Sequence, residues 1–383
     1  MNTQIFINSK FVETIGWTLL HSLWQIALVA FVLFVLLKLL RGFPANFRYW
    51  LSVFALVFAV ALPVFAFYQL NKISPTAFSG KEISKTGNSK TFNKQFYTPG
   101  NFTIQNENTS ELTKEKISFF FGSLKNLQSY FSKNLSAILP FLVGFWFVGI
   151  LIFSLRLIGG FWQLHIFRTR ELFAPDRKWQ DKFSELCKRL KIRQTVELFN
   201  SALVETPVVI GFLKPVVLIP VSVFLQISPH ELETIIAHEL VHIRRCDALV
   251  NFAQSFVEVL FFYHPFVWWM SSVIRIEREF AADESVVKIL ENSQIVYANA
   301  LANLEELRHL TNQKITPLAT AANGGNLMQR ISKILQKNTG ISGRKTVSLW
   351  SAVAALALIS AFLLTVFSFN NSPVVNADNK PKT

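Results

Sequence analysis

Four uncharged stretches of apolar residues constrain the fold of this chain more than any other feature of its sequence. They cover residues 14–37, 49–71, 135–155 and 346–370, and each has the roughly 20 residues that an α-helix needs to cross a bilayer. The composition agrees, because 51% of the 383 residues are hydrophobic. The sequence therefore predicts a mainly α-helical membrane protein with four transmembrane helices.

The distribution of basic residues predicts the orientation of these helices. Lys38, Arg41 and Arg48 lie in the short connector after the first span, which the positive-inside rule places in the cytoplasm. Both termini are then expected outside the bacterial inner (cytoplasmic) membrane. The formal net charge of +14 is explained by lysines and arginines that meet anionic lipid. We expect the lipid bilayer as a partner and no direct binding of nucleic acid, since the sequence has no module of that kind.

Residues 238–242 read His-Glu-Leu-Val-His, an H-E-x-x-H pattern. The serine, proline and glutamate of residues 228–231 form a capping-box pattern, which predicts that a helix begins just before it. On a helix, imidazoles four residues apart project from one face and can share a zinc ion. We expect His238 and His242 to bind one Zn²⁺ and Glu239 to act as the general base of a hydrolase.

A catalytic zinc ion usually has three protein ligands, and the acidic run at residues 277–284 can supply the third. Glu279 is favoured because Asp283 lies four residues further along the same helix face, where it can orient a ligating histidine. Glu277 is the alternative ligand. Such an arginine-flanked run on its own is typical of a solvated helix face, so this inference depends on the H-E-x-x-H pattern.

Asp247 follows His242 by five residues, close to the end of the predicted helix. It is expected either to hold the second ring nitrogen of a ligating histidine or to form a salt bridge with Arg244 or Arg245. The sequence leaves these two roles open.

Residues 248–276 are apolar enough to be considered a fifth span. A single crossing would separate His242 from Glu279 by the roughly 30 Å of the hydrocarbon core, which a shared zinc site does not allow. His264 and Pro265 predict a helix break instead. We therefore expect two helices that form a hairpin at the membrane.

Residues 205–220 have the pattern of two short strands around a turn. An edge strand beside a protease site can hold an extended substrate by main-chain pairing, although packing in the core is an equally good explanation of this pattern. The expected substrate-binding residues are Val208, Val209, Ile210, Gly211 and Phe212.

Four motifs together resemble the BlaR/MecR-type family of membrane zinc metallopeptidases, which are β-lactam sensors and antirepressors. The motifs are TPVVIGFLKP at 206–215, HELVHIRRCD at 238–247, HPFVWW at 264–269 and EREFAADE at 277–284. The resemblance implies a cytoplasmic, gluzincin-like α+β peptidase domain. It also implies that His238, His242 and Glu279 bind one zinc ion and that Glu239 is the catalytic base.

The resemblance also implies a function, because members of this family sense a signal outside the cell and cleave themselves or a cytoplasmic transcriptional repressor. The printed chain ends 13 residues after the fourth predicted span, so the C-terminal penicillin-binding sensor domain of the antibiotic receptors is expected to be absent. The predicted function is therefore signal-regulated proteolysis by an integral membrane zinc endopeptidase, with a protein substrate.

Two other functions are kept as alternatives. A housekeeping membrane-protein quality-control or prenyl-protein metallopeptidase shares the same motif and would show little dependence on a signal. A non-enzymatic membrane signalling scaffold would hold a structural metal, but structural zinc usually has four protein ligands and no fourth cysteine or histidine is evident nearby.

The predicted organisation of the chain follows from these spans and motifs. It comprises a two-helix transmembrane hairpin at 1–70, an extracytoplasmic loop at 71–134, a third transmembrane helix at 135–157, a cytoplasmic zinc metallopeptidase domain at 158–345, a fourth transmembrane helix at 346–370 and a short extracytoplasmic tail at 371–383.

Overall fold

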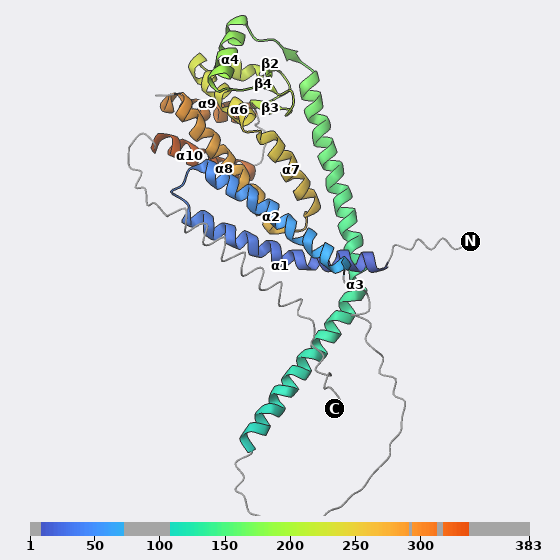
Figure 1. Cartoon of the computed structure of the whole chain (residues 1–383). Coiled ribbons are helices and arrows are strands. Elements are labelled where there is room, and N and C mark those ends of the chain that lie inside the picture. The colour runs from blue at the N-terminus through green and yellow to red at the C-terminus, as the bar shows by residue number, and fades with distance from the viewer. Residues whose placement is uncertain (1–8, 73–107, 291–292, 312–316, 337–383) are drawn as a thin grey trace, which may run out of the picture. The chain divides into compact units, whose positions relative to one another are not determined.

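The structure is a computed structural model that describes residues 9–72, 108–290, 293–311 and 317–336. This part of the chain is mainly helical (Figure 1). The helices are α1 (Ser9–Leu39), α2 (Ala45–Lys72), α3 (Asn108–Thr169), α4 (Arg177–Arg189), α5 (Val221–Gln226), α6 (Pro229–Arg244), α7 (Asp247–Leu260), α8 (Pro265–Ile289), α9 (Gln294–Thr311) and α10 (Pro317–Gln336). The strands are β1 (Leu172–Phe173), β2 (Glu197–Ser201), β3 (Val208–Ile210) and β4 (Val216–Pro220).

The described residues fall into two compact units. The first lies within Met1–Ser22 and Pro63–Val148, and the second lies within Leu23–Leu62 and Gly149–Thr383. All residues of the candidate site belong to the second unit.

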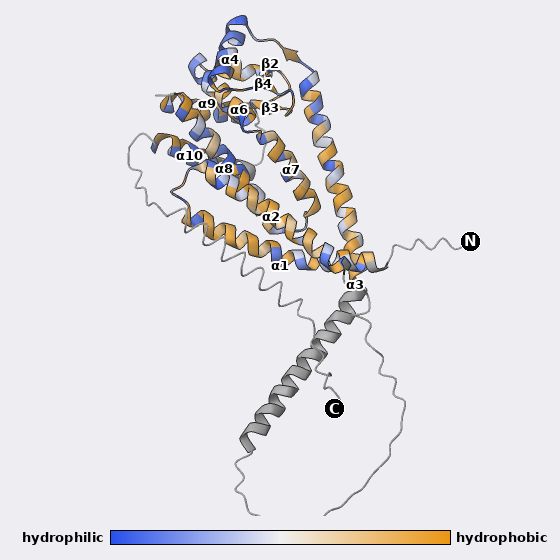
Figure 2. Cartoon of the chain, in the orientation of Figure 1, coloured by the Kyte–Doolittle hydropathy of each residue, from blue (hydrophilic) through white to orange (hydrophobic). Residues whose placement is uncertain are grey.

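Three helices of the described chain are long and apolar enough to cross a membrane. Their candidate spans are Phe11–Leu39, Ala45–Asn71 and Ile138–Thr169, which correspond to the first three predicted spans. Apolar residues follow α1 and α2 along their length (Figure 2). The predicted fourth span at 346–370 and the predicted tail at 371–383 lie outside the described residues.

α3 is longer than the sequence suggested. It continues unbroken from Asn108 to Thr169 and therefore passes both ends of the third span predicted at 135–157. Charged residues such as Arg156 and Arg168 oppose burial in hydrocarbon but do not disfavour a helix, so hydropathy underestimates the length of α3.

A four-stranded sheet has the order β1-β2-β4-β3. β2 and β4 are parallel, whereas β3 pairs with β4 in antiparallel register, with Val209 opposite Val217. This confirms the predicted pair of strands around a turn. In that turn Gly211 has φ +92°, a conformation that favours glycine. β4 is buried along its whole length, and β3 is an edge strand of the sheet.

The main core fixes α6, the helix that carries the H-E-x-x-H pattern. The predicted capping box is confirmed, because the Ser228 hydroxyl accepts from the Glu231 amide and the Glu231 carboxylate accepts from the Ser228 amide. Leu232, Ile236 and Leu240 form a stripe at helical spacing and are almost completely buried in the core. Each such side chain stabilises the fold by about 1.5–3 kcal/mol.

The predicted break near His264 and Pro265 is confirmed. α7 ends at Leu260, and α8 begins at Pro265 with His264 as its N-cap residue. This reversal lets α8 return beside α6, so that Glu279 on α8 reaches the histidines of α6.

Candidate metal centre

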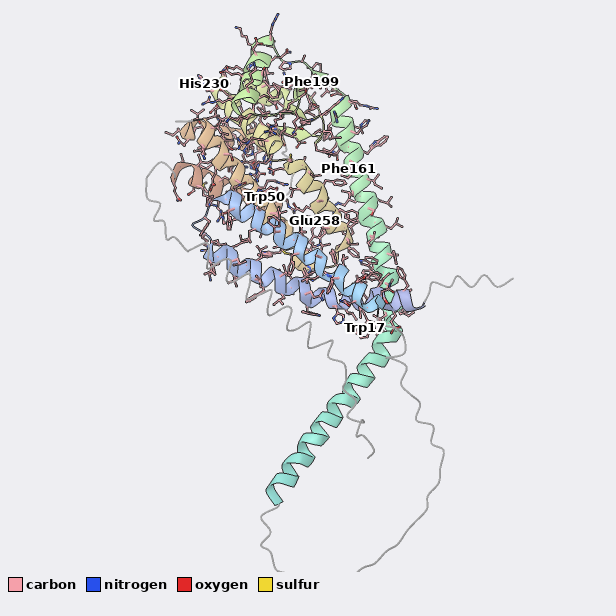
Figure 3. All side chains as sticks on the ribbon, viewed as in Figure 1. Trp17, Trp50, Phe161, Phe199, His230 and Glu258 are labelled. Atoms are coloured by element: carbon pink, nitrogen blue, oxygen red, sulfur yellow. The ribbon has the colours of Figure 1, made fainter. Side chains whose placement is uncertain are left out.

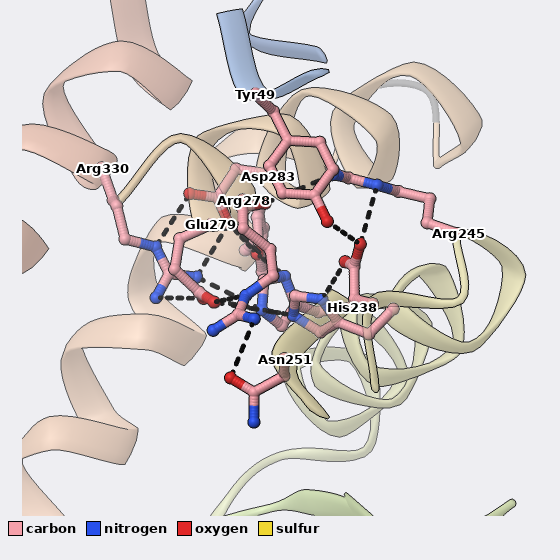
Figure 4. A network of polar contacts seen from close by, with 11 residues as sticks. Tyr49, His238, Arg245, Asn251, Arg278, Glu279, Asp283 and Arg330 are labelled. Atoms are coloured by element: carbon pink, nitrogen blue, oxygen red, sulfur yellow. Dashed lines mark hydrogen bonds and ion pairs between the residues drawn. The ribbon is translucent and has the colours of Figure 1, made fainter. Parts of the chain in front are cut away.

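The structure brings the three predicted ligands together at one point (Figure 4). The Nε2 atoms of His238 and His242 are 3.2 Å apart. The Glu279 carboxylate lies 3.4 Å from the first of them and 3.8 Å from the second. A tetrahedral zinc ion with bonds of about 2.0–2.1 Å holds its ligand atoms about 3.3 Å apart, so the donor set has the spacing that zinc requires.

Asp247 fixes the orientation of one imidazole. Its Oδ2 atom lies 2.7 Å from Nδ1 of His242, which makes Nδ1 the protonated ring nitrogen and leaves the Nε2 lone pair directed at the site. Burial alone lowers the pKa of His242, but the hydrogen bond to Asp247 and nearby carboxylates raise it overall. Asp247 also lies 3.5 Å from Nε of Arg245, so the geometry combines the two roles that the sequence left open.

Tyr297 plays the same part for the other imidazole. Its hydroxyl donates to Oδ1 of Asp283 at 2.5 Å and lies 2.8 Å from Nδ1 of His238, which must therefore be the donor to the tyrosine oxygen. Asp283 is 3.4 Å from the same ring nitrogen. The aspartate thus reaches the histidine chiefly through Tyr297, a residue that the sequence analysis did not identify.

The electrostatics of this arrangement fit a cation. Two imidazole lone pairs face each other at 3.2 Å, a separation that is unfavourable unless a positive charge lies between them. Burial acts to raise the pKa of the Glu279 carboxyl, but positive charge at the site, from His238 and His242 when they are protonated and from Arg330, holds that pKa well below its ordinary value. Glu279 is therefore an anion, as a metal ligand must be.

The two candidate third ligands point in different directions from α8. Glu279 faces the histidines, whereas the carboxylate of Glu277 pairs with Arg48 of α2 at 2.9 Å. Residues two apart on a helix lie on nearly opposite faces, so only one of the two can reach the site.

Arg330 of α10 supports the carboxylates of the site. Its guanidinium donates two hydrogen bonds of 2.8 Å to Asp283 and lies 3.3 Å from Glu279. A planar bidentate contact of this kind fixes a carboxylate in position and direction. Arg330 and Tyr297 were not found by sequence reasoning because they lie 92 and 59 residues from His238 and belong to no motif around it.

The N-terminal end of α2 contacts the support of the site directly. The Tyr49 hydroxyl donates to Oδ1 of Asp247 at 3.0 Å, and the Arg245 guanidinium stacks over the Tyr49 ring at 4.5 Å. At the same end, the Ala45 amide donates to the Glu284 carboxylate. The chain of contacts from Tyr49 through Asp247 therefore ends on a histidine of the donor set.

A cavity of about 210 Å³ opens onto the donor set. Glu239, His242 and Glu279 line it together, so the predicted base and two predicted ligands face the same space. Of the predicted substrate-binding residues, Val209, Gly211 and Phe212 also line this cavity. Ile210 is instead buried in a small core cluster, against which Val208 packs.

Comparison with known proteins gives this geometry a family context. A family model described as BlaR1 peptidase M56 matches residues 17–334. The matched range includes most of the first candidate span, the other two candidate spans, the sheet and every residue of the donor set.

The curated relatives are similar over part of their length. The regulatory protein BlaR1 of Bacillus licheniformis is 20% identical over 197 residues, which are 51% of this chain and 32% of that protein. The methicillin resistance mecR1 protein of Staphylococcus aureus strain Mu50 is 24% identical over 237 residues, which are 57% of this chain and 39% of that protein. The chain thus spans less than two fifths of each of these relatives. It is a membrane protein that belongs to the M56 peptidase family, a family of metallopeptidases.

Proposed function

We propose that this protein is an integral membrane zinc endopeptidase. The observation that carries the proposal is the meeting of His238, His242 and Glu279 beside a cavity that Glu239 also lines. Within the part of the chain that the structure describes, this group has three protein donors, which is the number typical of catalytic rather than structural zinc.

The roles of the residues follow from their positions. His238, His242 and Glu279 hold the ion, and Asp247 and Tyr297 keep the two rings in the ligating tautomer. When bound, zinc supplies Lewis acidity, which lowers the pKa of water in the site. Glu239 accepts a proton from the attacking water and delivers it to the leaving amine.

The proposed topology has four spans, with both termini outside and the gluzincin-like domain at 158–345 in the cytoplasm. Three candidate spans support it, as do Lys38, Arg41 and Arg48, which lie at and beside the turn between α1 and α2 and by the positive-inside rule favour the cytoplasmic side. Reporter fusions at both termini and after residue 170 test this arrangement.

The proposed biological role is regulated cleavage of the protein itself or of a cytoplasmic transcriptional repressor. Membership of the family that includes the regulatory protein BlaR1 supports this role. The contact of Tyr49 with Asp247 supports it too, because it joins a candidate membrane helix to the metal site.

The proposal is tested with the full chain in lipid nanodiscs, by measuring bound zinc and the cleavage of casein. We expect one zinc ion per chain and casein cleavage by the wild type. Glu239→Gln is expected to retain zinc but to lose activity by about 10²–10⁴-fold, because it removes the general base alone. Equal activity of the two proteins would overturn the assignment of Glu239, and absence of zinc would overturn the metal site.

Self-cleavage is tested by mass spectrometry of the wild type and of Glu239→Ala. Fragments found in the wild type alone would support it, whereas identical fragments in both would exclude it.

A further inference from the structure

A second cavity adjoins the one at the donor set and follows α3. It measures about 730 Å³, within the range of a few hundred to 1,000 Å³ that is usual for ligand sites. Five residues line both cavities, namely Val209, Gly211, Phe212, Ala248 and Asn251. The two cavities therefore meet where β3 ends and α7 begins.

α3 forms one wall of this second cavity and is held in place on both sides of it. Towards one end, a Cβ atom on Gly149 would overlap the ring of Phe262, and Phe153 stacks on the same ring with centroids 5.2 Å apart. Towards the other end, the Arg168 guanidinium donates to the Lys214 carbonyl at 3.1 Å. Contacts at both ends of the cavity therefore hold α3 at its distance from α7.

The walls are mostly apolar and aromatic. Phe161 of α3 and Phe252 of α7 both line the cavity and pack against each other with ring centroids 5.7 Å apart, and Figure 3 shows Phe161 on α3 and Glu258 on α7. The remaining large apolar residues of the lining are Phe153, Leu157, Leu164 and Trp268. Because the α3 wall lies within the candidate span Ile138–Thr169, this cavity suits a ligand with apolar side chains.

The charged groups of the lining are mainly basic. α3 contributes Arg156, His165 and Arg168, whereas the acidic residue of the lining, Glu258, is already paired with Arg275 at 2.8 Å. The cavity therefore favours a ligand that combines apolar groups with negative charge.

We infer that this cavity binds the substrate polypeptide away from the scissile bond, as an extended segment. A bulky apolar side chain of the substrate packs beside the Phe161–Phe252 pair, and an acidic side chain lies near Arg156. Two features favour a polypeptide as the occupant: the continuity of this cavity with the catalytic one, and the position of β3 as an edge strand, which can pair with an extended chain. This inference rests on the proposed peptidase function.

Two neighbouring glycines of α3 provide a matched test. Gly160 lines the cavity and Gly159 does not, and a Cβ atom at either position meets nothing within 4 Å. Leucine is a better helix former than glycine, so Gly160→Leu and Gly159→Leu both retain the helix, but Gly160→Leu alone fills the cavity. Both variants and the wild type, zinc-loaded in nanodiscs, are given a proteome-derived peptide library, and the cleavage sites are read by mass spectrometry.

We expect the wild type and Gly159→Leu to prefer phenylalanine or leucine, flanked by an acidic residue, at a fixed distance from the cleaved bond. Gly160→Leu is expected to cut kcat/KM for these peptides by about 10- to 200-fold and to spare peptides with alanine there. Equal profiles for the two variants would overturn the inference, as would loss of a bound lipid in Gly160→Leu with an unchanged peptide profile. Zinc-loaded wild type that cleaves no peptide would instead overturn the proposed function itself.

Discussion

Replacing Asp247 by asparagine tests whether this residue tunes the metal site. The carboxylate accepts from His242 at 2.7 Å and from Tyr49 at 3.0 Å, in a position that is 3% exposed. A hydrogen bond to a charged partner contributes about 1.5–3 kcal/mol, and the amide keeps the shape but loses the charge. We therefore expect zinc to bind about 10- to 100-fold more weakly to Asp247→Asn.

The assay is competition for zinc between the full chain and a chromophoric chelator, with Asp181→Asn as the control. Asp181 is an exposed residue of α4, remote in sequence from the ligands, and its replacement should leave the zinc affinity unchanged. A zinc affinity of Asp247→Asn within threefold of the wild type, in a protein that unfolds at the same temperature, would refute the reasoning.

Tyr49→Phe extends the same measurement to α2. The Tyr49 hydroxyl contacts no ligand and acts only by orienting Asp247, so zinc should bind more weakly than to the wild type, but by less than the about 10- to 100-fold expected for Asp247→Asn. Because Tyr49 acts through Asp247, the double variant should bind zinc about as weakly as Asp247→Asn alone. Additive losses in the double variant would mean that the two residues act separately.

Three further outcomes are expected. Glu279→Gln should weaken zinc binding by more than about 100-fold, beyond the effect of a supporting residue, whereas Glu277→Gln should leave zinc affinity unchanged; the reverse result would make Glu277 the ligand. Tyr297→Phe should lower zinc affinity by about 10- to 100-fold, because it removes the partner of Nδ1 of His238, and an unchanged affinity in the chelator assay would contradict that role. Burial raises the pKa of the Cys187 thiol from 9.0 to about 11, so iodoacetamide should label it much more slowly in the folded than in the unfolded protein at pH 9. The folded state holds this proton more tightly, so the contribution of Cys187 to stability is complete below pH 9 and is lost as the pH rises towards 11; equal labelling rates would contradict the burial.

The sequence predicted those parts of the site that depend on local geometry. The spacing of His238 and His242 and the helix break at Pro265 depend on the helical repeat and on backbone chemistry, which a few neighbouring residues determine. Tyr297 and Arg330 could not be predicted, because tertiary packing of α9 and α10 brings them to the ligands.

The second cavity depends even more on tertiary packing. Its existence follows from the distance between α3 and α7, which aromatic contacts such as Phe161 with Phe252 determine. Hydropathy marks the same residues of α3 only as part of a span.

The hydrogen bond between Tyr49 and Asp247 has a thermodynamic consequence that runs in both directions. If packing of α2 against the site raises the affinity of the site for its ion, thermodynamic linkage requires the converse. Binding of the ion must then stabilise the packing of α2 by an equal free energy. An empty centre would then release this helix end more readily than a filled one. A bound metal ion would thus also tie the end of a candidate membrane helix to the site that holds the ion.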